Sequence, residues 1–318
     1  MSGQRVSIIY NPIKVELDDL KAAVEAEPAS AGWAVKWLPT SEDDPGQGPA
    51  KEALDAGATM VIAVGGDGTV RAVAETLGGT GIPLALLPSG TGNLLARNLD
   101  LTLDDMAHSL ATAFGGGTRA IDVAAIEITR EDRTKDSHAF LVMAGTGLDA
   151  KIMSNTDPEL KKRVGWLAYA RALVPVLRDN SVLKLQYKVD SDRVRSARAQ
   201  GIVVGNCGSL PANIMLLPDA VVDDGLLDVI VLTPQSIGGW LAVLVKIFWE
   251  NGVVKRTKAG RKMADLKSDS VAMHQGKSLT VKLSRPEEVE LDGDPFGVMT
   301  GCVVTVEPGA LIIKVPQE

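Results

Sequence analysis

The sequence has little cysteine, few aromatic residues and no long apolar run, and each shortage excludes a class of protein. The two cysteines, Cys207 and Cys302, lie far apart and form no CxxC motif, so neither a disulfide framework nor a structural zinc site is predicted. Such sparse cysteine is typical of a reducing compartment. The apolar run at residues 237–249 contains Lys246 and is shorter than the roughly 20 residues a membrane helix needs.

An excess of basic residues and an export signal are also missing. The formal net charge is −7, whereas general affinity for nucleic acid requires a basic surface, so we expect no nucleic-acid partner. Residues 1–5 lead directly into a strand-like segment, without the apolar region of a secretory signal. These observations predict a cytoplasmic protein.

Glycine is plentiful, with 32 in 318 residues, and the length suits two domains. The first third alternates strand-like and helix-like segments, which predicts a parallel sheet covered by helices. The expected strands are residues 6–10, 33–38, 59–64 and 83–87. The expected helices are residues 16–27, 69–77, 91–98 and 103–114, and a turn-rich segment spans 41–49.

Beyond three consecutive glycines at 115–117 the pattern changes to short β-rich runs, among them a strand at 139–144 and two last strands at 302–306 and 311–315. Two helical segments, near 159–178 and 237–249, interrupt these runs. We predict a Rossmann-like three-layer α/β domain over residues 1–118 and a β-sandwich-like domain over 119–318, with an active site in the cleft between them. The last strand, at about 307–318, either closes the second domain or returns to the first.

The sharpest motif is GGDGT at residues 65–69, which follows a buried-strand pattern and precedes a helix. Glycines let a backbone approach a ligand closely, and the free amide groups at a helix N-terminus attract anions. We expect Thr69 to cap this helix and to donate its hydroxyl to a phosphate. The motif is neither a P-loop nor a dinucleotide fingerprint. A tight βα turn without a ligand is the simpler alternative.

A second glycine motif, PSGTGN at residues 88–93, also follows an apolar strand and opens a helix. Two such turns at neighbouring strand ends would form one crevice, which is where open α/β sheets bind ligands.

These two motifs, in this order and spacing, resemble the diacylglycerol kinase catalytic domain shared by bacterial diacylglycerol kinases and sphingosine kinases. More distantly they resemble NAD kinases and phosphofructokinases. The lipid kinases are favoured by an NP pair at 11–12, a GxGxDA segment at 145–150, a second-domain signature at 218–228, and a DGD at 292–294 similar to the family's DGE.

The resemblance implies ATP and Mg²⁺ as cofactors and a set of nucleotide-binding residues in the first domain. These are Asn11, Pro12, Thr40, Gly65, Gly66, Asp67, Gly68, Thr69, Val70, Arg71, Gly90, Thr91 and Asn93. It also implies a structural Mg²⁺ held by the Asp224 carboxylate and by the carbonyl groups of Val221 and Leu226, which are hard oxygen ligands.

Two carboxylates are candidates for catalysis. Asp294 matches the family's proton-accepting Glu but is one methylene shorter, so its carboxylate reaches less far. Asp67 lies in the phosphate turn, where it would meet a cation or accept a proton. Each has a structural alternative, because Asp67 suits a turn and the Asp292-Gly293 pair suits a hairpin.

Two segments combine basic residues with apolar helical faces, at 161–163 with the following helix and at 255–262. They suit peripheral contact with a lipid substrate on the inner face of an anionic membrane, although solvated charges on core-packed helices are the alternative. A homodimer is left open.

The sequence therefore predicts an ATP-dependent lipid kinase that phosphorylates a hydroxyl of a lipid such as diacylglycerol. An NAD-kinase-like enzyme for a soluble metabolite is one alternative. A catalytically weak lipid- or nucleotide-binding regulatory module is the other.

Overall fold

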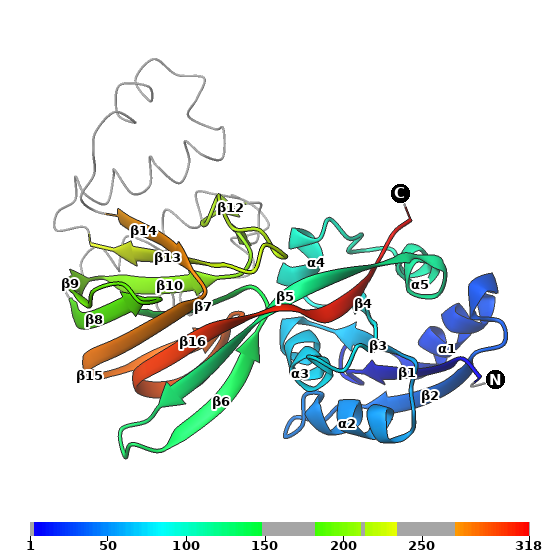
Figure 1. The fold of residues 1–318 in the computed structure, drawn as a ribbon. Helices are drawn as coiled ribbons and strands as arrows, with labels where there is room; N and C mark the ends of the chain where they lie inside the picture. The colour runs from blue at the N-terminus through cyan, green and yellow to red at the C-terminus, as the bar shows by residue number, and fades with distance from the viewer. Residues whose placement is uncertain (1–2, 148–181, 211–213, 234–270, 318) are drawn as a thin grey trace, which may run out of the picture.

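The protein has two lobes, one of helices and strands and one built from strands (Figure 1). The computed structural model describes residues 3–147, 182–210, 214–233 and 271–317. A 14-stranded sheet runs through both lobes, and its main path follows the order β14-β13-β10-β7-β15-β16-β4-β3-β1-β2. In the part of the chain that the structure describes, no helix is long and apolar enough to span a bilayer.

The first lobe is a three-layer α/β unit. Its parallel strands are β1 (Arg5–Tyr10), β2 (Ala34–Pro39), β3 (Met60–Gly65) and β4 (Leu84–Pro88). Its helices are α1 (Leu17–Ala26), α2 (Gln47–Asp55), α3 (Asp67–Leu77), α4 (Leu94–Asn98) and α5 (Met106–Gly115), with a short 3-10 helix, η1 (Pro28–Ser30).

Side chains of the buried strand β3 alternate between two apolar clusters, which places helices on both faces of the sheet. Val61 packs in the cluster that holds Val73 of α3. Ile62 packs in the cluster that holds Leu20 of α1 and Leu110 of α5. Because parallel strands align their carboxyl ends, the turns after β1, β2, β3 and β4 share one edge of this sheet.

The second lobe is a sandwich. Its strands are β5 (Gly117–Thr129), β6 (Lys135–Phe140), β7 (Met143–Gly147), β8 (Leu183–Val189), β9 (Arg195–Ala199), β10 (Gly201–Gly205), β13 (Leu227–Leu232), β14 (Val271–Gly276), β15 (Ser278–Leu291) and β16 (Asp294–Val315). A separate hairpin joins β11 (Ser209–Leu210) to β12 (Ile214–Met215).

The long strand β15 folds this part of the sheet on itself. Residues 279–283 pair with β8, whereas residues 289–291 pair with β7. The two layers enclose a core that includes Phe140, Leu185, Val204, Val229 and Val304.

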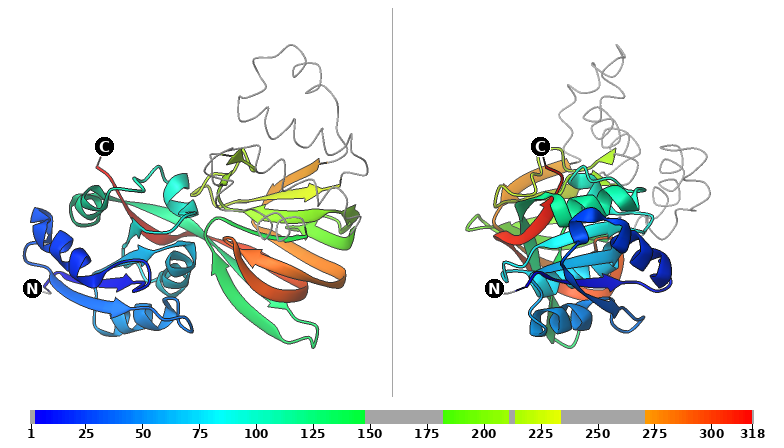
Figure 2. Two further views of the ribbon diagram at one scale, coloured as in Figure 1. Left: turned by 180° about the vertical axis from the view of Figure 1, so that it is seen from behind. Right: turned by 90° about the vertical axis from the view of Figure 1, so that its right-hand side faces the viewer.

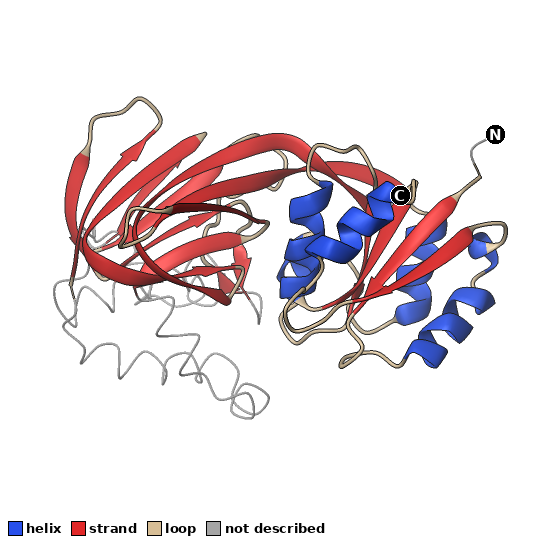
Figure 3. Cartoon of the chain, turned by 90° about the horizontal axis from the view of Figure 1, so that it is seen from below, coloured by secondary structure: helices blue, strands red, loops and turns tan. Residues whose placement is uncertain are grey.

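Strand β16 connects the lobes, as Figures 2 and 3 show. Its first half pairs with β15, and residues 301–315 pair with the whole length of β5. Near its end it pairs in parallel with β4, through Ile313 and Leu84. The predicted domain boundary at residue 118 stays a prediction. Both β5 and β16 run from one lobe into the other across this boundary.

Several predicted elements differ from the observed ones, and helices α4 and α5 each begin three residues later than expected. The segment 41–49 was expected to be turn-rich, but α2 begins at Gln47. Helix α3 begins at Asp67, two residues earlier than expected. The expected strand at 139–144 is divided between β6 and β7, and the two expected last strands are one strand with a bulge between Glu307 and Leu311. The helices predicted near 159–178 and 237–249 lie outside the described residues.

Candidate active site

The first glycine turn leaves the N-terminus of α3 without a side-chain cap. Gly66 occupies the cap position in an extended conformation, and no side chain bonds to the amide groups of the first turn. The prediction that Thr69 caps the helix is therefore wrong. Thr69 is buried in the first turn, and a Cβ on Gly65 would lie 2.7 Å from its Cβ. Uncapped amide groups at this sheet edge form an anion site.

The second glycine turn packs against the first. The Ser89 amide donates to the Gly65 carbonyl at 3.0 Å, and a Cβ on Gly90 would lie only 2.7 Å from the Gly66 Cα. Asn93, in the left-handed region at φ 48°, closes the turn by donating from Nδ2 to the Gly90 carbonyl at 2.8 Å. Its Oδ1 accepts from the Gly90 amide at 3.1 Å. A side chain at position 90 would separate the two turns.

Asp67 joins these turns. Its Oδ2 accepts from the Asn93 amide at 2.9 Å and its Oδ1 from the Leu94 amide at 2.5 Å, so one carboxylate serves the start of α4. Burial raises the pKa of Asp67, although the amide groups of Leu94 and Asn93 act in the opposite direction. Both oxygens are thus engaged in holding the turns together.

Asp294 reaches this place from the second lobe. As the first residue of β16, it lies over the start of α3, and a Cβ on Gly68 would be 2.7 Å from its Oδ2. Its side chain is 45% exposed and lies 3.7 Å from Arg71 Nη2. Its charge also contributes to the raised pKa of Asp67. The candidate site is therefore assembled from both lobes.

Arg71 is buried beside Asp294. Its guanidinium lies 4.4 Å above the centre of the Phe296 ring, and Nη1 is 3.7 Å from Glu75 Oε2. Among the described residues, Arg71 Nε and Nη1 and Ser89 Oγ are buried polar atoms without a hydrogen-bond partner. Because buried polar groups are normally paired, these atoms fit an anionic ligand at the turns. Ser89 was not predicted, although it lies within the second glycine motif.

Asp292 anchors the turn that carries Asp294. It is fully buried and accepts from the amides of Leu141, Val142 and Met143 at 2.9, 2.8 and 3.0 Å. Burial raises its pKa to about 6, against the lowering effect of these amides. Its backbone is left-handed, at φ 50°. Neither the DGD resemblance at 292–294 nor the hairpin signal of the Asp292-Gly293 pair predicts this anchor.

The remaining predicted nucleotide residues lie in different surroundings. Asn11 and Thr40 are at the same sheet edge, where their amides donate to the carbonyls of Val64 at 3.0 Å and Tyr10 at 2.9 Å. Pro12 and Thr91 are exposed. Val70 is buried in the core cluster, so its side chain does not line the edge.

The predicted metal residues lie elsewhere, on the loop before β13. Asp224 is exposed, and its Oδ1 accepts from the Leu226 amide at 2.9 Å, while Val221 is 46% exposed. Buried Asp122 holds the loop by accepting from the Gly225 amide at 2.6 Å, and it also accepts from the Gly309 amide at 2.7 Å. An accessible carboxylate on a braced loop fits a hard cation such as Mg²⁺.

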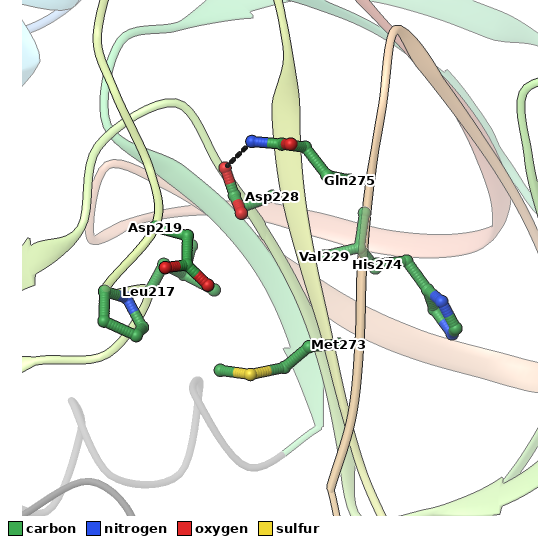
Figure 4. A pocket seen from close by; sticks show the side chains of 8 residues that line it. Leu217, Asp219, Asp228, Val229, Met273, His274 and Gln275 are labelled. Atoms are coloured by element: carbon green, nitrogen blue, oxygen red, sulfur yellow. Dashed lines mark hydrogen bonds between the residues drawn. The ribbon is translucent and has the colours of Figure 1, made fainter. Parts of the chain in front are cut away.

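A pocket of about 240 Å³ adjoins this loop (Figure 4). Leu217, Val229 and Met273 give it apolar walls, and Asp219 and Asp228 come from the loop and from β13. Burial raises the pKa of Asp228, to whose Oδ2 Gln275 donates a hydrogen bond at 3.4 Å. This pocket is separate from the glycine turns and was not predicted.

Known proteins match the chain over both lobes. The family model described as diacylglycerol kinase catalytic domain matches residues 5–126. The model described as YegS C-terminal NAD kinase beta sandwich-like domain matches residues 142–315. The chain is 30% identical over 322 residues to a probable lipid kinase YegS-like protein of Pseudomonas fluorescens, covering 100% of this chain and 97% of that protein.

Solved structures share the fold. A putative diacylglycerol kinase from Bacillus anthracis has a TM-score of 0.70 at 23% identity and covers 99% of this chain and 96% of its own. Yeast NADH kinase complexed with NADH has a TM-score of 0.52 at 10% identity, covering 98% of this chain and 83% of its own. The predicted fold class is confirmed. By the two family models and the full-length relative, the chain belongs to the diacylglycerol kinase catalytic domain family, with a second domain of the YegS C-terminal type.

Proposed function

We propose that this protein is an ATP-dependent lipid kinase that transfers the γ-phosphate of ATP to a hydroxyl of a lipid such as diacylglycerol. One observation carries the proposal: Asp294, from the second lobe, stands beside Gly68 at the uncapped start of α3. A half-exposed carboxylate next to an anion site is the arrangement that phosphoryl transfer to a hydroxyl requires.

The glycine turns would hold the nucleotide phosphates. The free amides of the first turn of α3, Ser89 Oγ, and the Arg71 donors that lack a hydrogen bond, Nε and Nη1, would offer hydrogen bonds to phosphate oxygens. Mg²⁺, bound with ATP, would supply neutralisation of phosphate charge.

Asp294 would accept the proton of the lipid hydroxyl as that oxygen bonds to the γ-phosphorus. The bond from the γ-phosphorus to the oxygen bridging it to the β-phosphate breaks, and ADP leaves with that electron pair. Asp67, also a candidate for catalysis, has both oxygens on backbone amides, so we assign it to positioning the two turns.

The second lobe would hold the lipid, and Asp224, with the carbonyls of Val221 and Leu226, would hold a structural Mg²⁺. The names of the relatives support the lipid as acceptor, since the Pseudomonas fluorescens protein is described as a probable lipid kinase. We place the enzyme in the cytoplasm, at the inner face of the membrane.

The test is incubation of the protein with Mg²⁺, γ-labelled ATP and a total lipid extract, beside a parallel incubation with NAD⁺. We expect label in a lipid and none in NADP⁺. Label in NADP⁺ alone would establish an NAD-kinase-like enzyme. Binding of ATP and lipid without turnover would establish a regulatory module, and either result would overturn the proposal.

A further inference from the structure

The outer layer of the sandwich has a basic face in this acidic protein. β9, β8 and the first half of β15 are neighbours, and their side chains alternate between the core and the exterior. Leu183, Leu185 and Leu279 point inward, into the core. The outward positions are Lys184, Gln186, Lys188, Ser196, Arg198, Ser278, Thr280 and Lys282, which we call the basic face.

Four of these eight residues are cations, and none is an acid. Within the described ranges, none of the four forms an ion pair. The nearby carboxylates are already engaged. Asp190 accepts from the amides of Lys277 and Ser278, and Asp192 pairs with Arg195 at 3.1 Å.

This arrangement lacks a compensating partner within the described chain. Lys184 lies directly opposite Arg198 in the antiparallel register, and like charges in this position destabilise a strand pair. A pocket of about 580 Å³ at these strands is lined by Lys184, Arg198 and Lys282, and also by the apolar residues Leu185, Ala197 and Leu283. Gln186, Ser196 and Ser284 add hydrogen-bonding groups to its lining.

We infer that the basic face is a docking surface for an anionic phospholipid bilayer. Four cations on one sheet surface complement a negatively charged membrane, which attracts basic residues within a Debye length. The inference rests on the proposed function, because a lipid acceptor brings the enzyme to a bilayer. A long polyanion such as DNA is the less suitable partner, since the chain as a whole, with this face included, carries a net charge of −7, and a polyanion that extends beyond the face would meet acidic surface.

The basic face is connected to the candidate site by one strand. β15 carries Lys282 on this face and ends at Leu291, directly before the Asp292 anchor and Asp294. In Figure 1 the strands β8 and β9 lie at the end of the molecule away from the α/β lobe. Docking there would leave the glycine turns free for nucleotide.

The test is sedimentation with vesicles of phosphatidylcholine containing 30% phosphatidylglycerol, against vesicles of phosphatidylcholine alone. The test variant combines Lys184→Gln, Arg198→Gln and Lys282→Gln. The control combines Lys21→Gln, Lys51→Gln and Arg133→Gln, which removes the same charge elsewhere on the surface. We expect anionic vesicles to bind the wild type, and the test variant to bind roughly 100-fold more weakly. The control should bind within about threefold of the wild type.

Equal binding of wild type and test variant, equal binding to both vesicle types, or tighter binding to duplex DNA than to anionic vesicles would each overturn the inference. Phosphorylation of lipid in neutral detergent micelles needs no anionic membrane. This assay therefore tests the proposed function separately from the docking inference. A test variant with full micelle activity is folded, so its vesicle result is decisive. Vesicle binding without any micelle activity in the wild type would instead overturn the kinase.

Discussion

Asp67 and Asp294 face the same glycine turn from different lobes, yet their surroundings are opposite. Asp67 is half-buried and accepts two backbone amides, whereas the Asp294 side chain is 45% exposed and, within the described residues, forms an ion pair only with Arg71, at 3.7 Å. A carboxylate with both oxygens engaged stabilises structure, while an accessible one can exchange a proton with a substrate. In the proposed reaction, the first lobe would provide a fixed backbone cradle and the second would provide the reactive side chain.

The sharpest test of this comparison is Asp294→Asn. Loss of the proton acceptor should reduce kcat by about 100- to 10,000-fold while leaving ATP affinity nearly unchanged. Turnover of labelled ATP and calorimetric binding of ATP measure the two effects. Glu307→Gln, an exposed change on the same strand, is the control. Unimpaired turnover by Asp294→Asn would end the assignment of this residue as base.

Asp292→Asn tests whether Asp292, rather than Asp294, dominates the pH dependence of the free energy of unfolding. Because its pKa of about 6 lies above the usual 3.8, the folded protein retains a proton that the unfolded chain loses between about pH 4 and 6. The free energy of unfolding should therefore fall as the pH rises through this window, by about 3 kcal/mol from this group.

The Asn variant should lose this dependence. Urea unfolding at pH 4.5, 5.5 and 7 measures it, with the exposed Glu131→Gln as control. If both variants keep the pH dependence of the wild type, Asp292 is not its source.

Gly90→Ala tests the rigidity of the cradle. The added Cβ would meet the Gly66 Cα at 2.7 Å, and a backbone atom cannot rotate away, so the turns must separate. We expect ATP to bind about 10- to 100-fold more weakly, which corresponds to the roughly 1–3 kcal/mol typical of overpacking.

Gly78→Ala is the matched control. Gly78 ends α3 at φ −50°, where an added Cβ would have its nearest neighbour at 3.6 Å. ATP titration should find this variant equal to the wild type. Unchanged affinity in Gly90→Ala would mean that the turns tolerate separation.

The smallest effect is expected for Phe296→Leu. The ring lies under the Arg71 guanidinium and contacts His138 with centroids 4.8 Å apart. Its loss should lower the free energy of unfolding by about 1–2 kcal/mol. Phe296→Tyr keeps the ring and should retain most of the free energy of unfolding that Phe296→Leu loses. Equal unfolding midpoints in urea for Leu, Tyr and wild type would remove Phe296 from the support of Arg71.

The α/β lobe was predictable because its signals are local. Buried strand β3, the GGDGT turn and the following helix are contiguous, so pattern and motif agreed. Helix α2 was missed because Gly46, Gly48 and Pro49 at its start read as a turn. The break between β6 and β7 at Leu141 and Val142 was missed because both residues are apolar. Their amides donate to the distant Asp292 carboxylate instead of to a neighbouring strand.

Only part of the candidate site could be predicted from the sequence. The glycine motifs and Asp294 could be found by spacing and resemblance. The capture of both Asp67 oxygens by α4, the unpaired Ser89 hydroxyl and the Asp292 anchor depend on contacts between segments far apart in sequence. Such contacts leave no periodic pattern in the chain.

The course of β16 also constrains the order in which the molecule can be made. During synthesis, β4 emerges long before β16, the strand that covers its open edge. Until β16 has been made and has paired with β4, the nascent α/β lobe exposes an unpaired parallel strand, which is a template for aggregation. Truncation near the C-terminus would therefore damage the N-terminal lobe first.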